Sequence, residues 1–357
     1  MSSLTSLPLE ILGEIGAHLE IQELRQTSLS CKAIEAGIRT HLFRSMAFSG
    51  TRTEMSEVLM RFLTNVNQSR TRGMGRACRF LHLEVRPEDN DSFDGTKDLL
   101  PALLMSSKKH LRRVTTLSLS FRGLSKAEVA SFHRMAKENP GWDAVTVFIT
   151  ELGTPTLSTL LKHSLHNVQT IDVRPNMVRH GVASIKEGCP EVRQLRVNFK
   201  TPINDFLRHL RGGARVKINQ LDNLQQLVVQ EKGPADTFPV GGIPQATDIP
   251  FRLALIADQL GGMASLRKIS IHFHRTIMTW ILPTWRLIPG DQLRTDLDDG
   301  LMTAIMAMAT RLPQVEDICL VEHSNNDVTM VHRGFRGSDG VMAVTIEAPG
   351  DENGWYN

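Results

Sequence analysis

A short apolar pattern recurs along this 357-residue chain and limits the folds that it can adopt. Each copy reads apolar-x-x-apolar-x-apolar, and the alternation at its end predicts a short strand with one buried face. The copies are Phe43/Met46/Phe48, Cys78/Leu81/Leu83, Val114/Leu117/Leu119, Trp142/Val145/Val147, Val168/Ile171/Val173, Val192/Leu195/Val197, Leu224/Leu227/Val229, Leu266/Ile269/Ile271, Val315/Ile318/Leu320 and Val341/Val344/Ile346. Recurrence of this kind indicates a repeat architecture.

The spacing between successive copies indicates what connects the strands. Ile171 follows Val145 after 26 residues, and Leu195 follows Ile171 after 24, which falls in the range of leucine-rich repeats, roughly 20–29 residues. The longest gap, 49 residues, separates Ile269 from Ile318. Stretches with helical periodicity occupy the gaps: 99–109, 126–138, 156–163, 178–187, 204–210, 251–260 and 297–311. Strand–helix alternation implies parallel pairing with right-handed crossovers. The predicted fold class is therefore α/β, an irregular solenoid with parallel strands on its concave face and helices on its convex face.

Three segments interrupt this alternation. Residues 233–250 are rich in Pro and Gly and predict a loop, and residues 280–294 predict a second loop. Turn-forming residues between Ile318 and Val344 predict that the last strands pair antiparallel. The solenoid is expected to span residues 49–350, followed by a polar tail at 351–357.

A small helical module is predicted at residues 1–48, ahead of the solenoid. Pro8 suits the start of a helix, and Ile11, Ile15 and Leu19 recur at helical spacing behind it. Two further short helices are expected around Leu24 and between Ile34 and Leu42. A module of ~40 residues rarely stabilises its own core. Because the Phe43/Met46/Phe48 copy follows directly, the module is expected to join the first strand without a cleavable linker near Phe48.

The opening motif Leu7-Pro8-x-Glu10-Ile11-Leu12, followed by Leu29-x-Cys31-Lys32 and His41-Leu42-Phe43-Arg44, resembles an F-box in the form common in fungal proteins. The junction Gly188-Cys189-Pro190-Glu191-Val192-x-x-Leu195 resembles that of F-box-type leucine-rich repeats. The resemblance implies that the module binds a Skp-type adaptor and, through it, a cullin–RING ubiquitin ligase. The residues expected at the adaptor interface or supporting it are Leu7, Pro8, Ile11, Ile15, Leu19, Leu24, Leu29 and Cys31.

The composition of the chain limits the classes of binding partner and the cellular compartment that we expect. The chain is 41% hydrophobic and 22% charged with a formal net charge of +3, which is typical of a folded protein and gives no basic footprint for nucleic acid. Short basic clusters are interpreted as solvated faces. The widely spaced Cys31, Cys78, Cys189 and Cys319 are interpreted as reduced thiols. Without a leader or a long apolar run, a cytoplasmic or nuclear protein with no membrane segment is expected.

No motif indicates catalysis or a bound cofactor. His272 and His274 share one face of a predicted strand, but no Cys or carboxylate beside them completes a metal site. Asp296, Asp298 and Asp299 are interpreted as residues at a helix start. Phosphate-loop and nucleophile-elbow motifs are absent.

Large apolar groups in the second predicted loop are candidates for partner binding. Trp and Arg are enriched at binding hot spots, and the candidate substrate-binding residues are Arg275, Trp280, Trp285 and Arg286. The alternative is that the tryptophans only pack this loop onto the solenoid.

The sequence leads to one main hypothesis and one alternative. The main hypothesis is a non-catalytic substrate receptor of a Skp–cullin–F-box ubiquitin ligase that binds an unknown protein substrate through its repeats. The alternative is a repeat scaffold for protein–protein interaction without any ligase. Co-purification of a Skp-type adaptor distinguishes the two.

Overall fold

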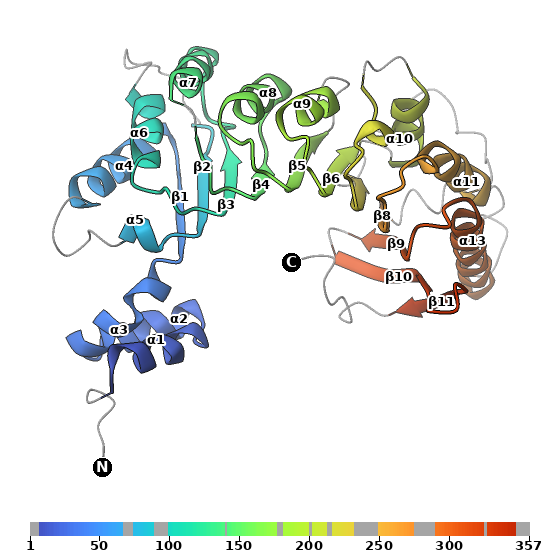
Figure 1. Cartoon of the computed structure of the whole chain (residues 1–357), viewed down its shortest axis with the longest axis horizontal. Coiled ribbons are helices and arrows are strands. Elements are labelled where there is room, and N and C mark those ends of the chain that lie inside the picture. The colour runs from blue at the N-terminus through green and yellow to red at the C-terminus, as the bar shows by residue number, and fades with distance from the viewer. Residues whose placement is uncertain are drawn as a thin grey trace. The chain divides into compact units, whose positions relative to one another are not determined.

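The structure is a computed structural model, shown in Figure 1. It describes residues 7–66, 74–88, 99–139, 141–176, 181–199, 202–212, 216–231, 249–274, 290–324 and 327–347. The chain divides into two compact units, an N-terminal unit (Met1–Val168) and a C-terminal unit (Gln169–Asn357). Each unit mixes helices and strands, which confirms the α/β fold class.

The N-terminal unit begins with three helices and continues with parallel strands separated by helices. Its elements are α1 (Leu9–Ala17), α2 (Ile21–Ser28), α3 (Lys32–Leu42), β1 (Ser45–Gly50), α4 (Arg52–Val66), α5 (Met74–Ala77), β2 (Phe80–Val85), α6 (Leu99–Lys108), β3 (Thr116–Ser120), α7 (Lys126–Glu138), β4 (Val147–Thr150) and α8 (Thr154–His163). The strands pair in sequence order, β1 with β2, β2 with β3 and β3 with β4. Phe48 lies within β1, where it pairs with Leu83.

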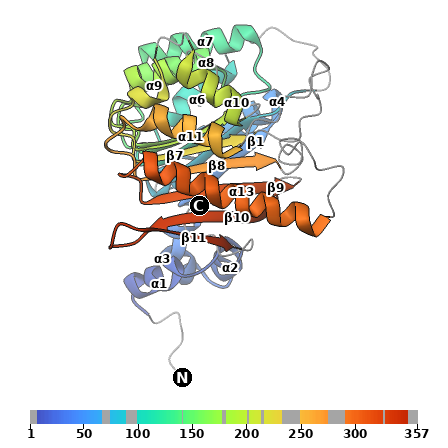
Figure 2. The same ribbon diagram turned by 90° about the vertical axis from the view of Figure 1, so that its right-hand side faces the viewer.

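The C-terminal unit repeats the alternation of strands and helices, and its last strands then pair antiparallel. Its elements are β5 (Thr170–Asn176), α9 (Gly181–Gly188), β6 (Gln194–Phe199), α10 (Pro202–Arg211), a 3₁₀ turn (Ile218–Gln220), β7 (Gln226–Glu231), α11 (Ile249–Leu260), β8 (Lys268–His274), α13 (Gly290–Arg311), β9 (Asp317–Ser324), β10 (Asp327–Arg336) and β11 (Met342–Glu347). Strands β5 to β9 pair in parallel. Strands β9, β10 and β11 pair antiparallel, as predicted, and run side by side in Figure 2.

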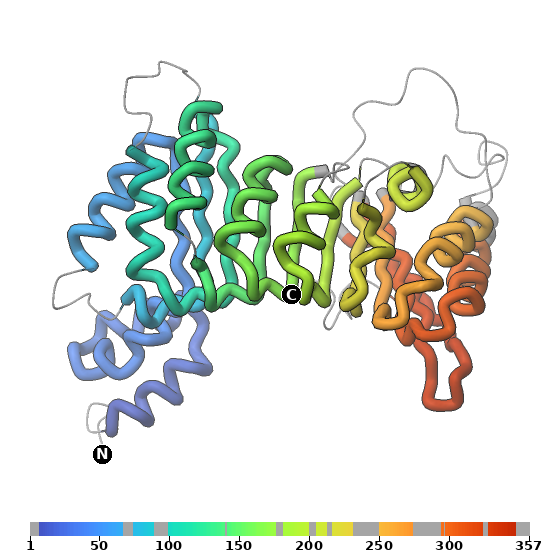
Figure 3. Tube along the Cα trace, turned by 45° about the horizontal axis from the view of Figure 1, so that its top comes forward, coloured from blue at the N-terminus to red at the C-terminus, as the bar shows by residue number. Residues whose placement is uncertain are grey.

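The repeating apolar residues form the core between strands and helices. Leu195 pairs with Leu227, Leu227 with Ile269, and Ile269 with Ile318, and all four side chains are buried. Successive helices pass on one side of their own unit's strands, as the tube view shows (Figure 3). The predicted stripe of Leu301, Ile305 and Met308 on α13, and Leu312 directly after the helix, is fully buried. Close packing of these parallel layers accounts for the regular register.

The fourth copy of the pattern was placed three residues too early. Leu117 pairs with Phe148 rather than with Val145, and Val145 belongs to a turn that closes on Trp142 with a 3.0 Å bond. The third position of the true copy is Thr150, which is polar but fully buried. Its hydroxyl accepts a hydrogen bond from Leu152 N at 3.0 Å, so this buried polar group is satisfied. Apolar patterning alone does not detect such a residue.

Further elements differ from expectation. α4 and α5 occupy a gap where no helix was predicted, and β10 occupies a stretch interpreted as turns. α13 begins at Gly290, inside the predicted loop 280–294, so Asp298 lies in the body of the helix rather than at its start. The other helices predicted between the strands are present, with ends shifted by at most three residues. None of the described helices is both long enough and apolar enough to cross a lipid bilayer.

Candidate partner-binding surface

The three N-terminal helices form a small core of their own. Leu12 on α1, Leu24 on α2, and Ile34 and Ile38 on α3 are buried together. The partly buried residues packed against them are Leu7, Leu19, Cys31 and Leu42. Helix α3 contacts both α1 and α2 and therefore holds the module together.

Close approach between α1 and α3 depends on a residue without a side chain. A Cβ atom at Gly37 would lie 2.5 Å from the Cβ of Leu12, which is shorter than side-chain contacts allow. Gly37 therefore lets Leu12 pack against the α3 backbone. Sequence reasoning did not single out this residue, although a glycine inside a helical pattern is a signal of close packing.

The ends of these short helices are fixed by local hydrogen bonds. Cys31 lies at the N-cap of α3, and its Sγ accepts a bond from Ile34 N at 3.4 Å. At the start of α2, the Glu23 carboxylate accepts a bond from Glu20 N at 2.9 Å. Both contacts satisfy backbone groups that would otherwise have no partner within the helix. Cys31 thus has a structural role within the module.

Large aliphatic side chains on the module are exposed. Leu29 is 86% exposed, Leu9 55% and Ile11 46%, and Ile15 and Ile21 are also exposed. Ile11 and Ile15 are separated by four residues on α1, which places them on one side of that helix. Exposed apolar residues concentrated in so short a segment are typical of a surface that another protein covers.

The predicted adaptor residues divide into three groups. Pro8, Ile11, Ile15 and Leu29 are exposed, whereas Leu24 is part of the buried core. Leu7, Leu19 and Cys31 are partly buried and pack against that core. Two exposed residues, Leu9 and Ile21, were not in the predicted set. Helical periodicity places Leu9 on the side of Leu12 and Gly16, which are buried, whereas Leu9 is exposed.

The candidate substrate-binding residues Arg275, Trp280, Trp285 and Arg286 lie outside the described residues. The predicted loop 233–250 also lies outside them, apart from its last two residues, which begin α11. The predicted tail at 351–357 is likewise not described.

The strand face that the helices leave uncovered in the N-terminal unit carries a row of polar side chains. His82 Nδ1 lies 2.9 Å from Ser118 Oγ, linking β2 to β3. Ser120 Oγ donates to the carboxylate of Glu151 at 3.0 Å, and Arg122 forms an ion pair with the same carboxylate at 2.6 Å. This face has the polarity expected of a surface in contact with water or with a polar partner.

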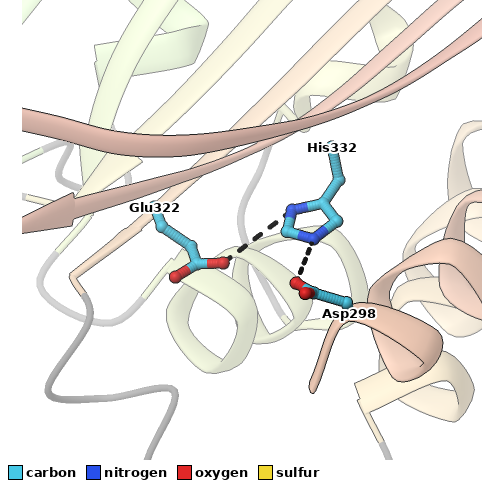
Figure 4. A group of neighbouring side chains, drawn as sticks. All are labelled: Asp298, Glu322 and His332. Carbon is cyan, nitrogen blue, oxygen red and sulfur yellow. Dashed lines mark hydrogen bonds and ion pairs between the residues drawn. The ribbon is translucent and has the colours of Figure 1, made fainter. Parts of the chain in front are cut away.

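A cluster of ionisable groups joins α13 to β9 and β10 in the C-terminal unit (Figure 4). Asp298, Glu322 and His332 bring three potential metal-ligand atoms within 4.8 Å of one another. His332 Nε2 lies 2.8 Å from Asp298 Oδ1, and because a carboxylate only accepts, this ring nitrogen is the donor. His332 Nδ1 lies 3.8 Å from Glu322 Oε1. Glu322 and His332 are both fully buried.

Arg294 identifies this cluster as an ion network. Its two Nη atoms donate to the two oxygens of Glu322, each at 3.0 Å. Its Nε donates to Asp298 Oδ2 at 3.0 Å, and Nη2 also pairs with Asp298. The guanidinium therefore supplies positive charge to both carboxylates, as a metal ion would. We interpret the cluster as a structural clamp between α13 and the two strands, and Asp298 acts there rather than as a helix cap.

Of the two histidines considered as a metal site, His272 contacts a histidine on the neighbouring strand. His272 is buried, and its Nδ1 lies 2.9 Å from Nε2 of His323 on the next strand. Burial, together with the nearby His323 and Arg196, holds the pKa of His272 well below its ordinary value. The side chain of His274 lies outside the described residues.

The three buried cysteines, Cys78, Cys189 and Cys319, do not have the properties of nucleophiles. Cys78 and Cys189 are buried, and burial raises the pKa of Cys78 to about 11 and that of Cys189 to about 12. Burial and the carboxylate of Asp317 also raise the pKa of Cys319. Thiols of this kind remain protonated at neutral pH and react slowly.

No protein-family model matches the chain. A comparison with curated proteins finds no match either.

Proposed function

We propose that this protein is a substrate receptor of a Skp–cullin–F-box ubiquitin ligase. In this proposal the α1–α3 module is the F-box that binds the Skp-type adaptor, and the strand–helix repeats that follow are an irregular leucine-rich-repeat domain that binds a protein substrate. The protein would position its substrate without catalysing a reaction itself. Holding two proteins together raises their effective concentration, which is sufficient to promote transfer.

The observation that carries the proposal is the exposed aliphatic surface on the module. Ile11, Ile15 and Leu29 are exposed although the module keeps its own core of Leu12, Leu24, Ile34 and Ile38. Covering one such side chain contributes about 1.5–3 kcal/mol. Several together offset part of the several kcal/mol that association costs. The resemblance of the same residues to an F-box identifies the partner class.

The repeat region supplies the proposed substrate-binding part. Parallel strands in both units leave one face without helices, and in the N-terminal unit this face carries His82, Ser118 and Glu151. Arg275, Trp280, Trp285 and Arg286 remain candidates for substrate contact because aromatic and Arg side chains dominate binding hot spots.

Adaptor binding is the test of this proposal. The full chain is co-expressed with a Skp-type adaptor, and the amount of adaptor that co-purifies is measured. An Ile15→Asp/Leu29→Asp variant is expected to retain less than a tenth of the adaptor, because each Asp places a charge in the apolar contact. Val58→Asp on α4 is the control, since Val58 is an aliphatic residue outside the module that is as exposed as Ile15.

Two outcomes would refute the proposal. One is that the unmodified chain brings down no adaptor although it is folded by circular dichroism. The other is that the Ile15/Leu29 variant brings down as much as the Val58 variant. Leu24→Ala shows how loss of folding alone affects the assay. Leu24 is buried, so its truncation is expected to lower the stability of the module by about 2–5 kcal/mol. Either of these two outcomes would favour the alternative, a repeat scaffold for protein–protein interaction without a ligase.

A further inference from the structure

A polar pocket of about 440 Å³ opens in the N-terminal unit where α6 and α7 end. Pockets of roughly 300–1,000 Å³ hold small ligands or single groups of larger ones. One wall comes from the end of α6 and the turn after it, with Lys108, Lys109 and Arg112. The opposite wall includes Asn139 and Trp142, which follow α7.

Lys108 lines this pocket and is buried. Its Nζ donates to the backbone oxygen of Asn139 at 2.6 Å and lies 5.5 Å from the ring centroid of Trp142. Lys108 and Trp142 are each more than nine-tenths buried. Loss of hydration lowers the pKa of Lys108, and the charge of Asp143 opposes this effect. An ammonium has three donors, and one bond is present among the described residues.

The ends of α6 and α7 are satisfied without the charges of Lys109 and Arg112. Asn139 caps the C-terminus of α7, so the bond from Lys108 satisfies a carbonyl at the negative end of that helix. The turn after α6 is closed by its own backbone bonds, including Leu111 N to Lys108 O at 3.0 Å. Lys109 and Arg112 are exposed and form no ion pair among the described residues. Arg112 Nε donates to Lys109 O at 3.1 Å, which holds the guanidinium across the turn and leaves its Nη atoms available.

The charges around the pocket favour an anion. Three cations line it against two carboxylates, those of Glu138 and Asp143. The Asp143 carboxylate lies over the backbone, since a Cβ atom at Gly141 would be 2.9 Å from its Oδ1. The charge of Asp143 also acts on Lys108 and offsets part of its positive charge, whereas Lys109 and Arg112 outnumber the single carboxylate of Glu138.

We propose that this pocket binds the phosphate group of a phosphomonoester. Arg112 supplies planar donors suited to phosphate oxygens, and Lys109 supplies a second positive charge at the rim. Lys108 supplies the buried charge, which is strengthened because the surrounding Trp142 excludes water. The phosphate can belong to a free small molecule or to a phosphorylated side chain. This site is independent of the adaptor surface on α1–α3.

The test measures binding to the full chain by calorimetry at constant ionic strength. The probes are glycerol 2-phosphate, for a free phosphomonoester, and N-acetyl phosphoserine amide, for a phosphorylated side chain. We expect saturable binding of at least one probe with a Kd of about 1 mM. The Arg112→Gln variant is expected to bind about tenfold more weakly, as the loss of one charge-assisted contact implies.

Arg113→Gln is the matched control, because Arg113 is an exposed neighbour of the same charge that does not line the pocket. It is expected to bind within twofold of the unmodified chain. Absence of saturable binding for both probes overturns the proposal. An equal loss in the Arg112 and Arg113 variants also overturns it, because the effect would then reflect net charge alone.

Discussion

The buried carboxylate of Glu322 provides the sharpest test of how the C-terminal unit is held together. Glu322→Ala removes the acceptor of two 3.0 Å bonds from Arg294 and the carboxylate that faces His332 Nδ1. The side chain is only 1% exposed, so water cannot replace these contacts. Removing one partner of a buried ion pair costs about 3–5 kcal/mol.

Glu316→Ala is the matched control for this variant. Glu316 precedes β9 and pairs with Arg267 at 3.6 Å, but its side chain is 58% exposed. An exposed pair of this kind contributes about 0–1 kcal/mol. The two variants therefore remove the same kind of side chain within one segment of the chain and differ mainly in its burial.

Urea unfolding followed by circular dichroism measures both effects. We expect the unfolding free energy to fall by about 3–5 kcal/mol for Glu322→Ala and by less than about 1 kcal/mol for Glu316→Ala. In thermal unfolding, 1 kcal/mol corresponds to roughly 2–4 °C for a unit of this size, so Tm should fall by about 6–20 °C. If Glu322→Ala costs no more than Glu316→Ala, the cluster does not clamp α13 to the strands and our interpretation is wrong.

Two further predictions follow from the buried titratable groups. Burial raises the pKa of Cys78 to about 11 and that of Cys189 to about 12. Iodoacetamide at pH 8 should therefore modify the half-buried Cys31 before these two thiols. Equal rates of modification at Cys31 and Cys189, measured by mass spectrometry, would contradict this prediction. Because the pKa of His272 is well below its ordinary value in the folded chain, the unfolded chain binds the proton first, below about pH 6.5. The unfolding free energy should therefore decrease from pH 7 to pH 5. Over the same pH range the urea midpoint should decrease less in His272→Asn than in the unmodified chain. An identical pH dependence in both proteins would show that His272 does not cause the loss of stability.

Local patterns in the sequence predicted most of the secondary structure. The helix over 126–138 is found with the same bounds, and the buried stripe from Leu301 to Leu312 on α13 follows helical spacing. These predictions succeed because apolar side chains must share one side of an element in order to be buried. The errors fall where a buried residue is polar, as at Thr150, or where a strand such as β10 contains turn-forming residues.

The exposed aliphatic surface of the module could be predicted only in part. Its location on α1 and α2 follows from the motif, but periodicity did not separate the exposed Ile15 from the buried Leu24. Both are aliphatic residues at helical spacing, and which of them faces the neighbouring helix depends on how α1 and α2 pack on α3. The ion network was also not predicted, because Asp298 and His332 are 34 residues apart and form their contact only when α13 packs beside β10.

The sequence by itself determined the alternation of strands and helices, the parallel order of the repeats and the helical module at the start. Each of these depends on side chains close together in the chain, whose spacing is visible without a structure. Only the tertiary structure decided which aliphatic residues of the module stay exposed, how Arg294 neutralises two carboxylates, and that Lys108, Arg112 and Trp142 border one pocket. These features depend on distances between separate elements, and such distances are set by packing rather than by local pattern.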